Sequence, residues 1–320
     1  MTDCKKNVQG TYLSIDDLMH LRSQVKGVRI SPRLQGRGIR QGQYSSRQLG
    51  RGGQFEEIRQ YAAGDDVRNI DWNVTARHRT PYVRSYCEER EQKRLLVLDQ
   101  RSSMFFGSSL MMKSYGAASL AAHLIWADQQ ANNRTGVVVF NDHLIEATPA
   151  RQGLQHLGNL FGIISQFNNS LSSDISVTDN PDMLNQALDI VQQHQKQHCQ
   201  GKAQIIVISD FSGFSETTCH RMAALNSHHS VIAVQVYDSL LDHFPESGYF
   251  TAINDSQTAR LNMANPKVRG DLLNALTSRI SSIRKQLNQV GVFTTRLHTG
   301  QSVTDQFHAM VNSDRLATES

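Results

Sequence analysis

The sequence has few of the residues that mark several protein classes. It contains only four cysteines in 320 residues, and no two of them form a CxxC pair, so neither a disulfide framework nor a zinc ribbon is expected. No apolar run approaches the ~20 residues of a membrane span, and residues 1–10 are too polar for a signal peptide. Hydrophobic residues at 39% and charged residues at 19% describe an ordinary globular chain. These features exclude collagen, coiled coil and integral membrane proteins and predict a cytoplasmic protein.

The net charge of +4 at pH 7 is unevenly distributed along the chain. Seven basic residues lie between Lys26 and Arg51 without an acidic residue among them, and glycines separate many of them. Such a stretch buries little apolar surface, so we predict an extended arm that could hold phosphates or an acidic protein surface. A solvated loop lying over acidic groups of the protein itself is the alternative. This arm and a short helix predicted over 14–27 form the first predicted segment, residues 1–49.

Short apolar runs alternate with helical patterns from residue 93 onward. Runs typical of strands buried on both faces occur at 93–99, 134–142, 203–210, 230–236 and 292–297, and a short edge strand is predicted at 143–148. Helices are predicted at 109–130, 151–167, 181–198, 215–227, 267–290 and 302–312. This alternation predicts an α/β fold: a doubly wound, mostly parallel sheet of the Rossmann type with helices on both faces.

Two of the predicted strands end in an aspartate, Asp99 and Asp210. In a doubly wound sheet, ligands bind beyond the carboxyl ends of the strands, at the switch in strand order. If the two strands are neighbours, both carboxylates converge with the hydroxyl of Ser103 into an oxygen cluster suited to Mg²⁺. The alternative for each aspartate is that it only caps the turn that follows.

The motif Asp99-x-Arg101-x-Ser103 resembles the Asp-x-Ser-x-Ser signature of the von Willebrand factor A fold. The metal-ion-dependent adhesion site of that fold binds a divalent cation and, through it, a carboxylate of a partner. The resemblance implies that Asp210 and Thr178 complete the site. Arg101 replaces a ligand serine, and a guanidinium there would repel a cation and pair with the carboxylates. We therefore expect a degenerate metal site and no cofactor; were Arg101 to point outward, Asp99, Ser103 and Asp210 would hold a metal weakly.

A longer motif precedes the first of these strands, GxFxxxRxYxxGDDxRxIDWxxxAR at residues 53–77, followed by YVRxYxxE at 82–89. It resembles the hallmark of the bacterial domain of unknown function 58 family. The residues of this hallmark are Arg59, Tyr61, Gly64, Asp65, Arg68, Asp71, Trp72 and Arg77. Their types predict a structural network in which arginines pair with acids and Trp72 anchors the segment to the α/β body. A partner-docking face is the alternative, because exposed arginine and aromatic side chains supply binding energy.

The predicted domain organisation is therefore the arm at 1–49, the hallmark segment at 50–92 and a von Willebrand factor A-like domain at 93–320. We expect a non-enzymatic protein-interaction module, because neither a GxxxxGK[ST] nor a GxSxG motif occurs. Its partner-binding crevice would comprise Asp99, Arg101, Ser103, Thr178 and Asp210, with Arg101 favouring a carboxylate.

The family resemblance implies specific partners: a MoxR-type AAA+ ATPase and other von Willebrand factor A-domain proteins, in assembly, maturation or stress response. Two alternatives stay open. The basic arm at 26–51 could bind nucleic acid, although nucleic acid is not the expected partner. A metal-dependent hydrolase using Asp99 and Asp210 is the least favoured, because no general base is evident.

Overall fold

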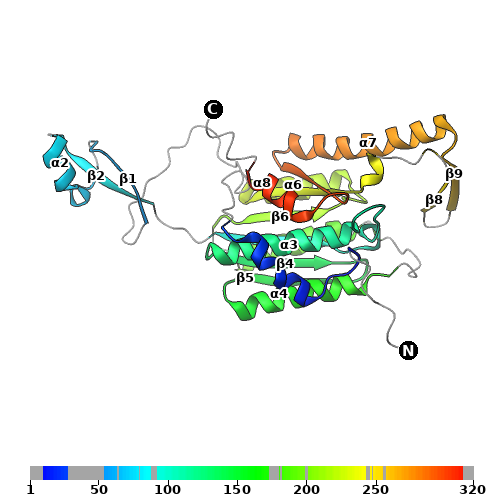
Figure 1. The fold of residues 1–320 in the computed structure, drawn as a ribbon, viewed down its shortest axis with the longest axis horizontal. Helices are drawn as coiled ribbons and strands as arrows, with labels where there is room; N and C mark the ends of the chain where they lie inside the picture. The colour runs from blue at the N-terminus through cyan, green and yellow to red at the C-terminus, as the bar shows by residue number, and fades with distance from the viewer. Residues whose placement is uncertain are drawn as a thin grey trace. The chain divides into compact units, whose positions relative to one another are not determined.

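The computed structural model describes residues 10–27, 54–62, 65–78, 80–87, 92–172, 180, 182–198, 201–242, 246, 248–254 and 257–312. The described residues fall into two compact units: those within Ile39–Glu91, and all others (Figure 1). The basic arm predicted at 26–51 lies outside the described residues from residue 28 to its end. The domain boundaries proposed from the sequence therefore stay predictions.

A six-stranded sheet with the order β10-β7-β6-β3-β4-β5 forms the centre of the larger unit. Its strands are β3 (Lys93–Asp99), β4 (Arg134–Phe140), β5 (Ile145–Arg151), β6 (Gln204–Ser209), β7 (Ser230–Tyr237) and β10 (Phe293–His298). All neighbours are parallel except β5, which is antiparallel to β4. The side chain of Asn141 accepts hydrogen bonds from the amides of His143 and Leu144, which closes the turn into β5. The mostly parallel α/β fold predicted from the sequence is confirmed.

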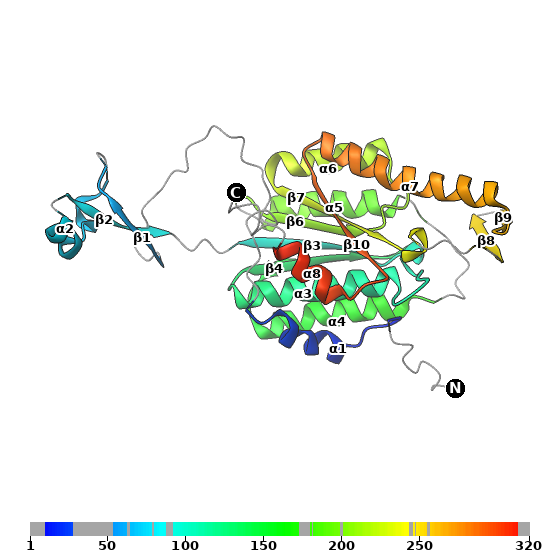
Figure 2. The ribbon, with the colours of Figure 1, turned by 45° about the horizontal axis from the view of Figure 1, so that its top comes forward.

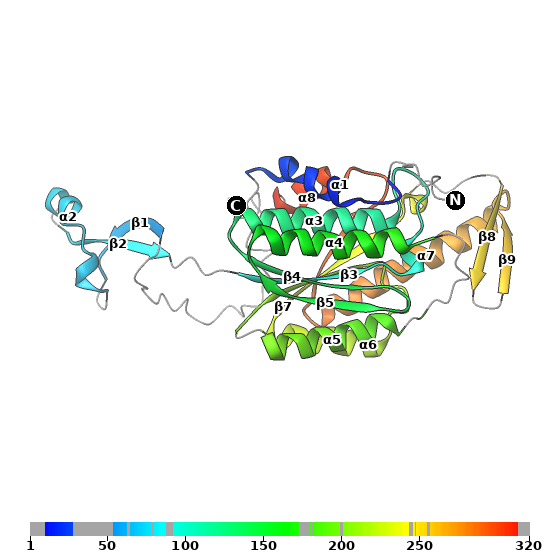
Figure 3. The same ribbon diagram turned by 90° about the horizontal axis from the view of Figure 1, so that it is seen from below.

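Helices cover both faces of this sheet (Figures 2 and 3). On one face, the core contains residues of α1 (Ile15–His20), α3 (Lys113–Gln130), α4 (Leu154–Ser170) and α8 (Val303–Asn312). On the other, it contains residues of α5 (Met183–His198), α6 (Glu216–His228) and α7 (Pro266–Gln289). The buried strands therefore divide their side chains between two cores: Leu96 and Leu98 face the first, Leu95 and Val97 the second. None of the described helices combines the length and apolar character needed to cross a bilayer.

The helix predicted over 14–27 is present, but it is split. Ser14 and Asp17 form a capping box at the start of α1, and a 3₁₀ turn, η1 (Leu21–Val25), continues it. Leu18 and Val25 are buried in the first core, and Trp126 of α3 donates a hydrogen bond to the carbonyl of Leu18 at 2.9 Å. This N-terminal helix thus packs on the α/β body.

Two hairpins have no counterpart among the elements predicted from the sequence. One pairs β8 (Tyr249–Asn254) with β9 (Gln257–Asn262). The other forms the smaller unit: β1 (Gln54–Gln60) pairs with β2 (Tyr82–Cys87), and the connection between them contains η2 (Val67–Asn69) and α2 (Trp72–His78).

Candidate functional site

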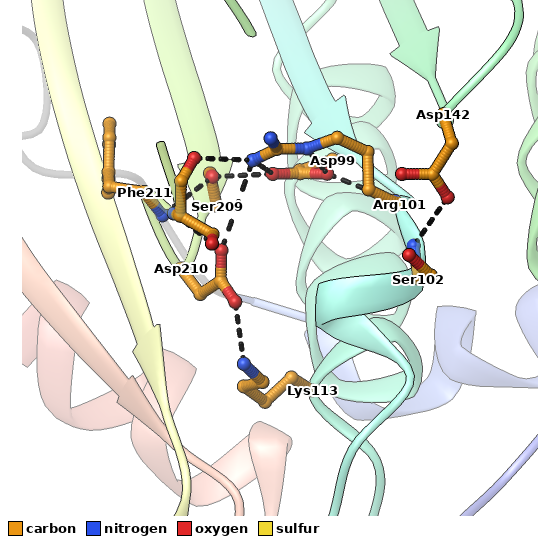
Figure 4. Close-up of polar contacts among 9 residues, drawn as sticks. Asp99, Arg101, Ser102, Lys113, Asp142, Ser209, Asp210 and Phe211 are labelled. Atoms are coloured by element: carbon orange, nitrogen blue, oxygen red, sulfur yellow. Dashed lines mark hydrogen bonds and ion pairs between the residues drawn. The ribbon is translucent and has the colours of Figure 1, made fainter. Parts of the chain in front are cut away.

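The site predicted at the strand ends lies where the chain order of the sheet reverses. From β3, the sheet continues through β4 and β5 on one side and through β6, β7 and β10 on the other. Strands β3 and β6 are parallel neighbours, with Leu98 opposite Ile208 in the register. Asp99 is the last residue of β3 and Asp210 directly follows β6, so both aspartates stand at the switch point (Figure 4).

Arg101 points inward and pairs with Asp99 in a bidentate arrangement. Its Nε and Nη2 donate to the two carboxylate oxygens of Asp99 at 3.0 and 2.7 Å, and its backbone N–H donates to Oδ1 at 3.0 Å (Figure 4). Nη2 also donates to the carbonyl of Ser212, and the guanidinium stacks on the ring of Phe140. Both ionic side chains are fully buried. The outward orientation of Arg101 considered from the sequence is therefore not the one observed.

Ser209, the last residue of β6, supports the same carboxylate. Its hydroxyl donates to Asp99 Oδ2 at 2.6 Å and accepts from the backbone N–H of Phe211 at 2.8 Å. Phe211 has a positive φ of 55° and is fully buried. Such a backbone conformation costs free energy in a residue with a large side chain, and this hydrogen bond and the second core hold it in place.

Asp210 is neutralised by a second cation, Lys113 at the start of α3. The ammonium of Lys113 lies 2.6 Å from Oδ2, while Arg101 Nη2 lies 4.0 Å from Oδ1. Burial raises the pKa of Asp210, but the charges of Lys113 and Arg101 and the hydrogen bonds from Lys113 and the amide of Ser212 outweigh it and lower the pKa below its usual value. Asp210 is therefore an ion-paired carboxylate.

Lys113 was not predicted as a site residue, although the sequence contained a signal. It is the only charged residue in α3 before Asp128 and stands at the amino end of the helix. A cation there faces the positive end of the helix dipole, which is unfavourable without a nearby anion.

The hydroxyls next to Arg101 do not join the carboxylate cluster. Ser103 Oγ is buried and forms no hydrogen bond with any described residue, so its predicted convergence with the two aspartates is not observed as a contact. The backbone N–H of Ser102 instead donates to Asp142 Oδ2, beyond the end of β4, at 2.8 Å (Figure 4). Thr178 lies outside the described residues.

These residues do not fit a divalent cation. Each of the two carboxylates already has a protein cation at hydrogen-bond distance, Arg101 on Asp99 and Lys113 on Asp210. A metal ion between them would meet two positive charges and would have to displace a buried bidentate pair. Nowhere in the part of the chain that is described do three or more His, Cys, Asp or Glu side chains gather as a metal site.

The hallmark residues lie in the smaller unit, and an ion pair of the predicted charge network is described there. Arg59 binds both carboxylate oxygens of Asp65 at 2.8 and 2.5 Å. Asp66 and Asp71 serve as caps: their side chains accept from backbone amides at the starts of η2 and α2. Asp66 and Asp71 therefore also fix the local backbone of the connection between β1 and β2.

The remaining hallmark residues are at the surface of this unit or outside the description. Trp72 is 70% exposed, and the predicted anchoring of this segment to the α/β body stays a prediction. Arg68 and Arg77 are exposed, Tyr61 is half-buried, and Gly64 lies outside the described residues.

The fold and site define an α/β protein with a self-neutralised carboxylate pair at the switch point. The profile of the family described as "Protein of unknown function DUF58" matches residues 57–279. The chain belongs to this family, as its hallmark motif predicted.

Similar proteins include two uncharacterized mycobacterial proteins, Rv1480 of Mycobacterium tuberculosis and Mb1516 of Mycobacterium bovis. Each is 27% identical over 266 residues, which is 82% of this chain and 80% of theirs. Among solved structures, the conserved hypothetical protein BatB from Bacteroides thetaiotaomicron covers 71% of this chain and 99% of its own at a TM-score of 0.42 and 16% identity. An aerotolerance-related membrane protein from Bacteroides fragilis gives the same coverage and TM-score at 15% identity.

Proposed function

We propose that this protein is a non-enzymatic interaction module with a von Willebrand factor A-like domain. Its docking face is the edge of the sheet at which the parallel strands β3, β4, β6 and β7 end, called the carboxyl edge below. The observation that carries the proposal is the mutual neutralisation of Asp99 with Arg101 and of Asp210 with Lys113. Side chains engaged in this way serve neither as general acid and base nor as metal ligands, but they hold the loops at the strand ends in one arrangement and so preorganise the docking face.

The placement of the two aspartates supports the von Willebrand factor A-like assignment. The resemblance requires Asp99 and Asp210 to meet, and they stand at the ends of neighbouring strands. The site differs from the adhesion site of that fold because the chain supplies its own cations. Docking at this face would therefore be independent of divalent metal.

The partner we propose is a MoxR-type AAA+ ATPase, together with other von Willebrand factor A-domain proteins, in assembly, maturation or stress response. This choice comes from the family resemblance. The cytoplasmic location and nucleic-acid binding by the arm at 26–51 stay predictions from the sequence.

Affinity purification of the tagged full chain from its native bacterium, with and without ATP, tests this proposal. We expect a MoxR-type ATPase to co-elute with an amount that depends on nucleotide, and the amount that co-elutes without ATP should not fall in EDTA. Phe106, 40% exposed in the loop after β3, provides the site variant Phe106→Ala, and Phe293, 47% exposed at the first residue of β10, provides the control Phe293→Ala at the opposite edge. Only Phe106→Ala should reduce co-elution. Absence of an AAA+ ATPase from both eluates would refute the proposed partner.

A further inference from the structure

The carboxyl edge carries a surplus of negative charge, although the protein as a whole is positive at +4. Its described carboxylates stand at the ends of β3, β4, β6 and β7 or in the connections that follow these strands: Asp99, Asp142, Asp210, Asp238, Asp242 and Glu246. The cations described there are Arg101, Lys113 at the start of α3, Arg260 in the connection after β7, and Arg296 of β10, whose guanidinium lies over the Tyr237 ring. Six carboxylates against four cations leave a formal charge of −2 with histidine neutral. At the opposite edge of the sheet Arg94 is paired with Asp128, and the further basic residues there are Lys93, Arg134, Arg151 and Lys202.

The two cations at the centre of this edge have no charge to offer a partner. Arg101 and Lys113 already contact Asp99 and Asp210 at 2.6–3.0 Å. A carboxylate from a partner would have to compete with these internal pairs and would leave a buried aspartate uncompensated. The expectation that Arg101 favours a partner carboxylate therefore conflicts with its observed engagement.

The acids beside the central pairs have no lysine or arginine of the described chain at ion-pair distance. Asp142 uses Oδ2 for the amide of Ser102, and its Oδ1 is buried and accepts no hydrogen bond from any described residue. Asp242 Oδ2 lies 2.6 Å from Nε2 of His298, and the Asp242 side chain is 50% exposed. Burial raises the pKa of Asp238, but hydrogen bonds outweigh this and lower the pKa, so that carboxylate adds negative charge behind the surface.

Exposed apolar side chains accompany these acids. Phe106 and Leu110 lie in the loop between β3 and α3, and Leu144 lies in the turn between β4 and β5. The loop between β3 and α3 is fixed across the edge: Ser102 is bonded to Asp142, and the amide of Ser108 donates to Asp238 at 3.0 Å. The apolar residues are therefore presented on a rigid surface, which reduces the entropic cost of docking.

We propose that the carboxyl edge docks a basic segment of a partner protein that also carries an apolar side chain. Lysine or arginine of the segment lies against Asp242, with the charges of Asp142 and Asp238 behind the surface, and the apolar side chain packs among Phe106, Leu110 and Leu144. This inference rests on the proposed function, since it specifies the chemistry of the partner at the same face. It reverses the charge that the sequence predicted for the partner.

Fluorescence anisotropy with the full chain tests this inference. The probes are a short labelled peptide in which arginine alternates with leucine and a twin in which glutamate replaces each arginine. We expect Leu144→Ala to weaken binding of the basic peptide about five- to tenfold. The control is Leu154→Ala: Leu154 is 65% exposed against 64% for Leu144, but it starts α4 near the end of β5, at the opposite edge. It should leave the dissociation constant unchanged.

Because both leucines are exposed, both variants should retain the thermal unfolding midpoint of the wild type, and Leu110→Ala provides a second site variant. Equal weakening by Leu144→Ala and Leu154→Ala would overturn the proposal, as would an effect of Leu144→Ala on the acidic twin alone. The assay contains no ATPase. If the basic peptide binds as expected while no ATPase co-purifies, the inference about the basic segment is supported and the proposed ATPase partner is refuted. If an ATPase co-purifies but Leu144→Ala leaves binding of the basic peptide unchanged, the proposed partner is supported and the inference about the basic segment is refuted.

Discussion

The guanidinium of Arg101 balances the buried charge of Asp99 at the switch-point site. It is fully buried, binds both oxygens of Asp99 and lies 4.0 Å from Asp210. In the variant Arg101→Ser, Asp99 would remain buried with the Ser209 hydroxyl and one backbone amide as its donors. Removing one partner of a buried ion pair costs about 3–5 kcal/mol, a large part of the roughly 5–15 kcal/mol by which a domain is stable.

Magnesium should restore part of that loss in Arg101→Ser alone. The new serine completes the oxygen pattern of Asp99 and Ser103, and a divalent cation there would replace the missing positive charge. Binding to the folded state adds about 2.7 kcal/mol when free Mg²⁺ is about 100 times its dissociation constant. Urea unfolding followed by circular dichroism, in MgCl₂ and in EDTA, measures this difference. The wild type should unfold at the same urea concentration in both.

A matched control exists at the other end of the sheet. Arg94 is as deeply buried as Arg101 and pairs with Asp128, to which Thr135 and Asn133 also donate. Arg94→Ser should be destabilised to a similar extent, but Mg²⁺ should not restore it because a single carboxylate is described there. A wild type stabilised by Mg²⁺ as strongly as Arg101→Ser would refute the conclusion that the guanidinium takes the place of a metal. A folded Arg101→Ser that loses less than about 1 kcal/mol would refute the burial cost.

Three other predictions concern single side chains. Because the pKa of Asp210 is lowered in the folded state, its ionised form stabilises the fold above the ordinary pKa of about 3.9, and this stabilisation is lost as the pH falls below that value. Lys113→Met removes one cause of the lowered pKa, so the midpoint of acid unfolding, followed by circular dichroism, should move to higher pH. Trp72→Ala should change the free energy of unfolding of the smaller unit by no more than about 0.5 kcal/mol, since its side chain is 70% exposed, and a larger loss in urea unfolding would contradict that exposure. Burial lowers the pKa of His123, so the free energy of unfolding should decline as the pH falls below about 6.5, where the unfolded chain takes up the proton. His123→Gln should reduce this dependence of stability on pH, and an unchanged slope would contradict the prediction.

The central strands β3, β4, β6 and β7 could be predicted from the sequence because each is a short apolar run between polar segments. Asp99 and Asp210 could then be assigned to one edge of the sheet, because each follows such a run and the carboxyl ends of parallel strands share an edge. The β8–β9 hairpin was missed because its strands, YFTAIN and QTARLN, mix apolar and polar residues without a long apolar run.

The contacts within the site were less accessible to sequence reasoning. Arg101 is two residues from Asp99, so their pairing could be considered from spacing alone. Lys113 and Asp210 are 97 positions apart, and only the packing of α3 against the sheet brings them together. The helix predicted from residue 109 begins at Lys113, because the preceding residues form the loop that bonds to Asp238.

The origin of its positive charge decides what this site can recognise. A divalent cation held by carboxylates keeps open coordination positions and attracts a further carboxylate from outside. A guanidinium and an ammonium that have already formed their hydrogen bonds with Asp99 and Asp210 have no such open position. What remains at the surface is the half-exposed carboxylate of Asp242 and the apolar side chains of the loops, with the charges of Asp142 and Asp238 behind them. Docking there should consequently weaken with rising salt and persist in EDTA, the opposite of a metal-dependent adhesion site.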